Sequence, residues 1–123
     1  MTTLLVLYRA PEGGADALST LEARYRDEHL PLVAQTPGLR STRIWRVGGA
    51  LGGETDLALV AAMDFDDRAA MDDGLRSDPM RAAGRILREI APGLATFLVL
   101  EDAPDLLAGD AGAQPPVDTV ATP

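Results

Sequence analysis

The stretch Tyr25-Arg26-Asp27-Glu28-His29-Leu30-Pro31-Leu32-Val33 contains the only histidine of this 123-residue chain. At helical spacing one apolar stripe forms, which includes the histidine: Leu18, Leu21, Tyr25, His29, Leu32 and Val33. Pro31 has no backbone N–H, so the carbonyl group of Asp27 loses its helical partner. The sequence therefore predicts a helix that kinks near Leu30 and carries one inward-facing imidazole.

The segments around this helix predict a strand before it, an N-cap at its start and a turn that ends it. Thr3 to Arg9 is short and apolar and predicts a strand that is buried on both faces, or nearly so. Asp16 is a plausible N-cap of the helix, which we expect to run to about Gln35. Thr36-Pro37-Gly38 then ends it.

Two further strands follow, separated by glycine-rich sequence. Leu39 to Val47 alternates with a period of two, with Arg43 and Trp45 on one side. The segment from Gly48 to Asp56 contains too much glycine for regular structure, and Leu57 to Phe65 predicts the next strand. The simplest arrangement is an antiparallel hairpin with a long loop.

The last third predicts two helical regions and a strand. Asp66 is the expected cap of the first region, which pauses at Ser77-Asp78. Pro79 suits the first turn of the next helix, whose apolar stripe is Met80, Ala83, Leu87 and Ile90. Ala95 to Glu101 is the final strand. Residues 102–123 are acidic and poor in large apolar groups, so we expect a disordered tail after a domain of residues 1–101.

The order strand, helix, strand, strand, helix, strand predicts an α+β fold of the ferredoxin-like βαββαβ type. Its four-stranded antiparallel sheet carries both helices on one face. The other face would be bare and apolar, so we expect a homodimer that covers it. Thr42, Ile44 and the small residues of Leu57 to Met63 are compatible with that second face.

Composition excludes several classes of function. The net charge is −8 and no basic patch is present, which argues against nucleic-acid binding and against anionic membrane surfaces. The chain has no cysteine, and its first residues lack the pattern of a signal peptide, so we expect a cytoplasmic protein.

His29 has two interpretations, both left open by its sequence context. An imidazole with a pKa near neutrality can take up and return a proton, as enolisation, lactone migration or aldol cyclisation requires. Tyr25, one turn earlier, could orient the ring or donate to a carbonyl oxygen. Alternatively, His29 only hydrogen-bonds a backbone carbonyl group, for instance the one freed by Pro31, and locks the kink.

Other candidates are weaker. Tyr8 and Trp45 could line an aromatic pocket or belong to the core, and Arg43 could pair with an anionic substrate or remain solvated. A register slip of one residue would exchange Arg43 and Trp45 between pocket and dimer interface. The aspartates of residues 64–73 lack histidine partners and calcium-loop spacing, so we predict helix caps and no metal site.

Three segments together resemble a known family: Leu5 to Arg9, Tyr25 to Val33 with its His-Leu-Pro-Leu, and Pro37-Gly38-Leu39. They resemble the EthD-like branch of the dimeric α+β barrel proteins. Ser77-Asp78-Pro79-Met80 and the closing strand are similar to its second half. The resemblance covers residues 3–101, and the Gly48 to Gly53 loop and the acidic extension depart from it.

The resemblance implies a homodimer of ferredoxin-like subunits, each with a small-molecule pocket between helices and sheet. Relatives include lactone isomerases, polyketide cyclases and proteins of ether degradation or oxygenase chemistry. We therefore expect a cofactor-independent isomerase or cyclase that acts on an apolar or aromatic, polyketide- or lactone-like substrate, with His29 as general acid/base. The alternatives are an oxidoreductase-type role, either a cofactor-free monooxygenase or a haem-handling one with His29 as iron ligand, and a non-catalytic binding protein.

Overall fold

Four antiparallel strands form one sheet in the order β2-β3-β1-β4 in the computed structural model, which describes residues 1–108. The strands are β1 (Thr2–Arg9), β2 (Leu39–Arg46), β3 (Leu57–Phe65) and β4 (Ala95–Glu101). The helices are α1 (Gly14–Arg24), the π-helical turn η1 (Tyr25–His29), α2 (Leu30–Val33), α3 (Arg68–Leu75), α4 (Asp78–Ile90) and α5 (Pro104–Ala108). Each of the two crossovers spans one intervening strand, which is the split βαβ arrangement.

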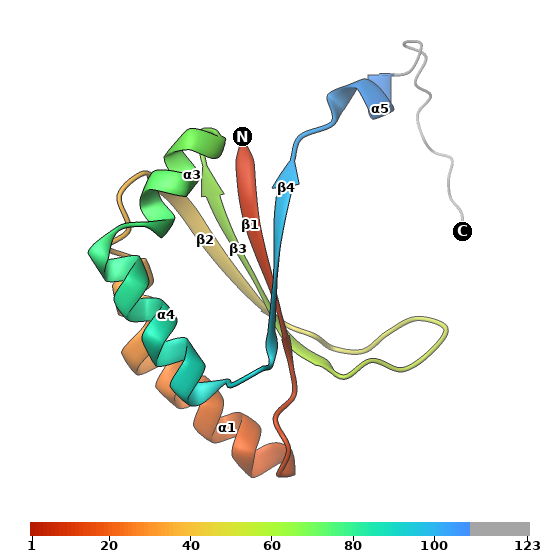
Figure 1. Ribbon diagram of the computed structural model, residues 1–123. Helices are drawn as coiled ribbons and strands as arrows, with labels where there is room; N and C mark the ends of the chain where they lie inside the picture. The colour runs from red at the N-terminus through yellow and green to blue at the C-terminus, as the bar shows by residue number, and fades with distance from the viewer. Residues whose placement is uncertain (109–123) are drawn as a thin grey trace.

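The helices α1, α3 and α4 all lie on one side of the sheet (Figure 1). Antiparallel pairing joins β1 to β3, β1 to β4 and β2 to β3. The predicted ferredoxin-like βαββαβ fold is therefore confirmed. None of the helices in residues 1–108 has the length and apolar character needed to cross a bilayer.

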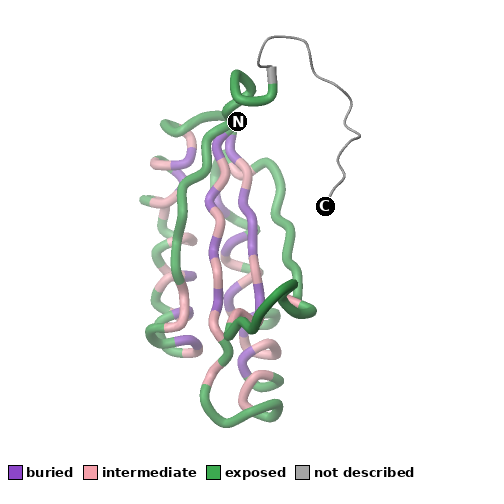
Figure 2. The backbone as a smooth tube through the Cα atoms, turned by 90° about the vertical axis from the view of Figure 1, so that its right-hand side faces the viewer, coloured by how far each residue is buried: buried purple, intermediate pink, exposed green. Residues whose placement is uncertain are grey.

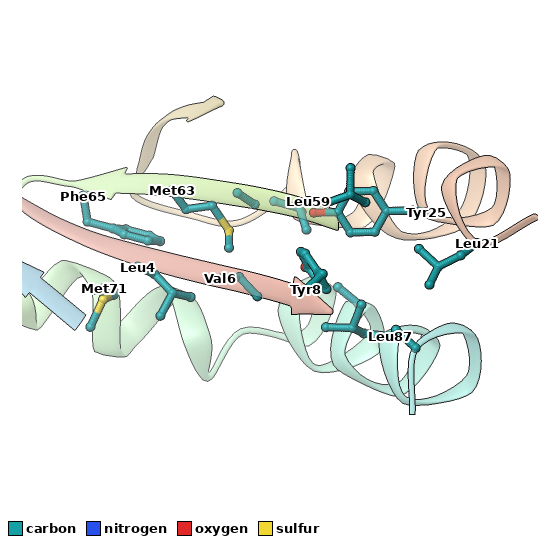
Figure 3. Packing of buried hydrophobic residues seen from close by; sticks show 14 residues of the cluster. Leu4, Val6, Tyr8, Leu21, Tyr25, Leu59, Met63, Phe65, Met71 and Leu87 are labelled. Atoms are coloured by element: carbon teal, nitrogen blue, oxygen red, sulfur yellow. The ribbon is translucent and has the colours of Figure 1, made fainter. Parts of the chain in front are cut away.

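The core lies between the helices and the two central strands. Along β1, buried residues alternate with half-buried ones, so only the side toward the helices is fully enclosed, rather than both sides as predicted. Figure 2 shows the same contrast between purple central strands and green outer strands. In Figure 3, Phe65, Met63 and Met71 pack at one end of this core, and Tyr8 and Tyr25 at the other. Burial of such large apolar groups contributes about 1.5–3 kcal/mol each.

The predicted kink is a single π-helical turn. The backbone N–H of Leu30 donates to the carbonyl oxygen of Tyr25, five residues earlier. Pro31 then occupies the first turn of α2, where its missing N–H costs least. The helix thus absorbs the proline by widening one turn before it, and π-turns of this kind are frequent at functional sites.

Two predicted caps differ from the structure. Asp16 lies within the first turn of α1, and the residue before that helix is a left-handed glycine. Asp67, rather than Asp66, caps α3, because its carboxylate accepts from the backbone N–H of Ala70 at 2.8 Å. Asp66 instead pairs with Arg40 across 2.9 Å. Asp66 is thus held in an ion pair by a residue of β2, and sequence spacing does not reveal that partner.

Glycine at position 74 of α3 is required by packing. A Cβ atom there would lie 2.9 Å from Cε1 of Phe65, and 3.0 Å from both the carbonyl oxygen of Pro37 and Cγ2 of Thr36. Such distances demand that the neighbours move. Gly74 therefore lets α3 approach the sheet and the turn before β2 closely.

The sheet face opposite the helices, here called the open face, carries Leu5, Leu7, Trp45, Val60, Leu98 and Leu100. Trp45, Leu98 and Leu100 are 42%, 41% and 43% exposed. Thr42 and Ile44, which the sequence assigned to this second face, pair with core residues of β3 and so point toward the helix side. Their place on the open face is taken by Arg43 and Trp45. The exposed apolar surface is nevertheless present, as predicted.

The chain beyond the last strand is partly structured. Residues 104–108 form the short helix α5 where the sequence predicted disorder. The rest of that predicted tail, 109–123, lies outside the described residues.

Candidate functional site

A cleft of about 660 Å³ opens on the helix side of the sheet, with α4 along one wall and β1 and β4 along the other. Its apolar lining includes Leu4, Val6, Tyr8, Met80, Leu87 and Phe97, and His29 is its only imidazole. Volume and lining are those of a small-molecule site. The cleft forms because the helices pack over the central strands and leave the inner side of the edge strand β4 uncovered.

The π-helical turn brings His29 to this cleft. His29 is the last residue of η1, is only 4% exposed, and lies against α4. Its Nδ1 atom is 3.0 Å from the carbonyl oxygen of Ala83 on α4. The ring stacks on Tyr25, with centroids 4.9 Å apart and planes inclined by 21°. Two independent contacts therefore fix the imidazole in position and in rotation.

The hydrogen bond to Ala83 also selects the tautomer of His29. A carbonyl oxygen only accepts, so Nδ1 carries the proton and Nε2 keeps its lone pair. The sequence raised the interpretation that this histidine bonds a backbone carbonyl group, and such a bond exists. Its acceptor belongs to α4, however, and not to the turn before Pro31.

Burial lowers the pKa of His29 below its usual value, and the hydrogen bond to the Ala83 carbonyl oxygen opposes part of that decrease. Burial dominates because charging the ring would place a cation among apolar groups. At neutral pH the ring is therefore an uncharged base with Nε2 free to accept a proton.

Tyr8 and Tyr25 form an aromatic pair, and Tyr25 is the member that contacts the imidazole. Their rings meet edge to face, with centroids 5.3 Å apart and planes at 75°. Burial raises the pKa of Tyr8 strongly, and the neighbouring Tyr25 raises it further. Burial also raises the pKa of Tyr25, while a hydrogen bond with Tyr8 works in the opposite direction. Both phenols are thus protonated donors. Tyr8 lines the cleft together with His29, whereas Tyr25 is not among the lining residues and stacks on the imidazole.

The structure does not bring Trp45 and Arg43 to His29. Both lie on the open face, where the guanidinium carbon of Arg43 is 5.0 Å from the centroid of the Trp45 ring. Of the predicted site residues, His29, Tyr25 and Tyr8 therefore lie in one cluster. Arg43 and Trp45 lie apart from that cluster.

Sequence reasoning missed the outer wall of the cleft. Three arginines of α4 line it, Arg81, Arg85 and Arg88, together with Gly84. Their spacing of four and then three residues was the available signal, since it places them on one helical stripe next to the apolar one. No three His, Asp or Glu side chains within residues 1–108 gather closely enough to hold a metal ion.

Comparison with known proteins shows which solved structures the chain is similar to. No family model matches the chain, and no curated protein sequence matches it. A solved EthD family protein of Bacillus halodurans is 29% identical, with a TM-score of 0.75, and the match covers 84% of this chain and 99% of that chain. The chain is therefore similar to an EthD family protein in both sequence and fold. The resemblance seen in the His29-Leu30-Pro31-Leu32 segment is thereby confirmed.

Other solved structures share the fold of this EthD-like chain at low identity. A dimeric ferredoxin-like protein of unknown function from Bacteroides fragilis is 15% identical with a TM-score of 0.61, over 82% of this chain and 95% of that one. SnoaB from Streptomyces nogalater, described as a cofactor-independent oxygenase, is 16% identical with a TM-score of 0.56, over 82% and 91%. At this identity they bear on the fold alone.

Proposed function

We propose that this EthD-like chain is a homodimeric enzyme without a cofactor, which binds an apolar or aromatic small molecule and moves one of its protons. The observation that carries the proposal is His29, a buried neutral imidazole with its tautomer fixed at the inner end of an apolar cleft. In the proposed reaction Nε2 removes a proton next to a carbonyl group and returns it at another position. Removal of that proton is the step that isomerisation and aldol-type cyclisation share; in an aldol-type cyclisation the enolate carbon then bonds to a second carbonyl carbon, and the proton goes to the oxygen of that carbonyl group.

Tyr8 and Tyr25 have different roles in this proposal. Tyr8 shares the cleft with His29 and is protonated, so its hydroxyl group can turn from its hydrogen bond with Tyr25 and donate to the developing enolate oxygen. Tyr25 is a positioning residue, because its ring stacks on the imidazole and holds it. The donor function that the sequence suggested for Tyr25 is thus assigned to Tyr8.

The dimer is part of the proposal. The open face exposes a continuous apolar surface, and solved relatives in the fold are described as dimeric. In such a dimer Trp45 and Arg43 lie in the interface rather than in the cleft. Native mass spectrometry tests this directly: it gives the number of subunits, and any organic molecule retained in the cleft appears as extra mass.

Proton exchange tests the chemistry. Aryl ketones are incubated in D₂O at pH 7 and their α-protons are followed by ¹H NMR. We expect exchange above background with the wild type and loss of it in His29→Asn, whose amide can still donate to the Ala83 carbonyl oxygen but is not a base. Tyr25→Phe keeps the stacking ring and should retain most of the rate. Exchange that survives in His29→Asn would refute the role of the imidazole.

Cofactor-free oxygenation is the second candidate, favoured by the shared fold with SnoaB and by the same base. Removal of a phenolic proton by Nε2 would give an electron-rich anion that reacts with O₂. Consumption of O₂ by wild type with an anthrone-like phenol, and not by His29→Asn, would support it. If wild type binds ligands without exchange or O₂ uptake, and His29→Asn binds them equally well, a carrier function is favoured.

Haem fits the site less well. Axial ligation would use Nε2 of His29, but that residue is 4% exposed and Tyr25 stacks on its ring. A porphyrin needs an open face beside its ligand. A Soret band after reconstitution, lost in His29→Asn, would overturn this argument.

A further inference from the structure

The three arginines on the cleft wall differ in charge pairing from most of the others in the chain. Of 11 arginines, six form ion pairs with carboxylates: Arg24, Arg26, Arg40, Arg46, Arg68 and Arg76. Arg81, Arg85 and Arg88 have no ion pair within residues 1–108, although the chain is strongly acidic. Glu89, the carboxylate next to them in sequence, pairs with Arg24 instead.

These arginines stand beside the large apolar cleft described above. Arg81, Arg85 and Arg88 all line it, and its lining contains no aspartate or glutamate. All three are exposed, so they form its rim, while His29 lies buried at its inner side. A ligand that fills the cleft would therefore contact apolar side chains along its body and positive charge at its outer end.

Gly84 widens the cleft between these arginines. A Cβ atom at this position would meet only Nη1 of Arg88, at 3.8 Å, so packing does not require glycine here. Glycine inside a helix costs about 1 kcal/mol relative to alanine. The absent side chain leaves a gap in the wall, and the guanidinium group of Arg88 lies over it.

We propose that the cleft takes an amphiphilic organic anion, an apolar or aromatic body with a carboxylate or similar acidic group, which Arg81, Arg85 and Arg88 bind at the rim while the reacting carbon lies at His29. This rests on the proposed function and names its substrate class. The ordinary alternative, a solvated helix face, explains exposed arginines but not the concentration of three arginines without ion pairs at a cleft whose lining contains no carboxylate. Guanidinium groups bind carboxylates through two parallel hydrogen bonds, which would also orient the ligand.

A matched pair of dyes tests the charge. 1-Anilinonaphthalene-8-sulfonate is an anionic probe, and N-phenyl-1-naphthylamine is the same ring system without the sulfonate. Both are titrated by fluorescence against the full chain. Gly84→Phe fills the gap in the wall, and only the signal that it removes is assigned to the cleft.

We expect Arg81→Gln and Arg85→Gln each to weaken binding of the sulfonate dye by about threefold to tenfold, with the neutral dye unchanged within about twofold. Arg68→Gln removes the same charge from an exposed position on α3, outside the cleft, and should change neither dye. Added salt should weaken the sulfonate dye selectively.

The two possible failures are distinct. If Gly84→Phe removes both signals but the arginine variants leave the sulfonate dye unaffected, or weaken both dyes equally, the anion proposal is overturned and the pocket stands. If Gly84→Phe leaves both dyes bound, the cleft is not a ligand site, and the proposed function fails with it.

Discussion

The folding stability of this chain should fall as pH drops from 7.5 to 5.5, because of His29. Its pKa is lowered in the folded state by burial. In this range the unfolded chain therefore binds a proton that the folded chain does not, and the free energy of unfolding decreases with falling pH. His29 is the only histidine of the chain. Hydrogen bonds from neighbouring side chains lower the pKa of carboxyl groups such as Asp64 and Asp66, which moves their titration further below this pH range.

The size of the effect has an upper limit. With an unfolded pKa of about 6.5, a folded protein that bound no proton at His29 anywhere in this range would lose about 1.4 kcal/mol between pH 7.5 and 5.5. For a domain of this size that corresponds to a decrease in Tm of roughly 4–8 °C. Stability is fully present above the unfolded pKa and is lost as the pH falls toward the folded one.

The assay is urea unfolding followed by circular dichroism at several pH values and one fixed protein concentration, since a dimer gains stability with concentration. The matched variant is His29→Asn, which does not titrate. It should be less stable than wild type at pH 7.5 and approach it by up to about 1.4 kcal/mol at pH 5.5. A constant difference would refute the lowered pKa, and a widening difference would mean that the folded protein prefers the imidazolium form. Either result would contradict the lowered pKa, and the widening difference would also remove the uncharged base from the proposed mechanism.

Three further predictions concern packing, assembly and capping. In urea unfolding, Gly74→Ala should destabilise by about 1–3 kcal/mol because its Cβ collides with neighbours, whereas Gly84→Ala should stabilise by up to about 1 kcal/mol; equal shifts would contradict the packing argument. Leu98→Glu should yield a monomer in sedimentation, and Val99→Glu, equally exposed at 41% but on the helix side of the same strand, should leave the dimer intact; a dimer in both would exclude the open face. Asp67→Ala should cost about 1 kcal/mol in thermal unfolding through loss of the α3 cap, and an unchanged Tm would show that the cap contributes nothing.

Most of the fold was accessible from the sequence because local signals and global topology agree. Period-two alternation, Pro-Gly stops and the apolar stripe of α4 predicted strands and helices close to their observed bounds. One error occurs where a side chain has two possible partners. Asp66 and Asp67 are equally suited to cap a helix, and only the position of Arg40 across the sheet decides between them.

The site was predicted in part. The inward stripe placed His29 and Tyr25 correctly, because helical spacing is a local property. The side of the sheet to which Trp45 points depends on register, which a strand sequence alone does not fix. The three arginines of α4 were missed because their spacing places them on one helical stripe but does not tell a stripe beside a cleft from one in solvent. The distinction can be made only when the structure shows that the inner side of β4 is uncovered and that a cleft lies there.

The two interpretations of His29, structural and catalytic, are not alternatives in this structure. The hydrogen bond from Nδ1 to the Ala83 carbonyl oxygen ties the π-helical turn to α4, and the same bond leaves Nε2 as the basic atom. Removing the whole side chain in His29→Ala would therefore disturb the fold and the proposed chemistry together. Asparagine keeps a donor near Nδ1 and supplies no base, so a stable, correctly assembled His29→Asn protein without proton exchange separates the two roles. If that variant loses its assembly at pH 7.5 as readily as His29→Ala, the imidazole is needed mainly for packing, and the case for a base at this position loses its support.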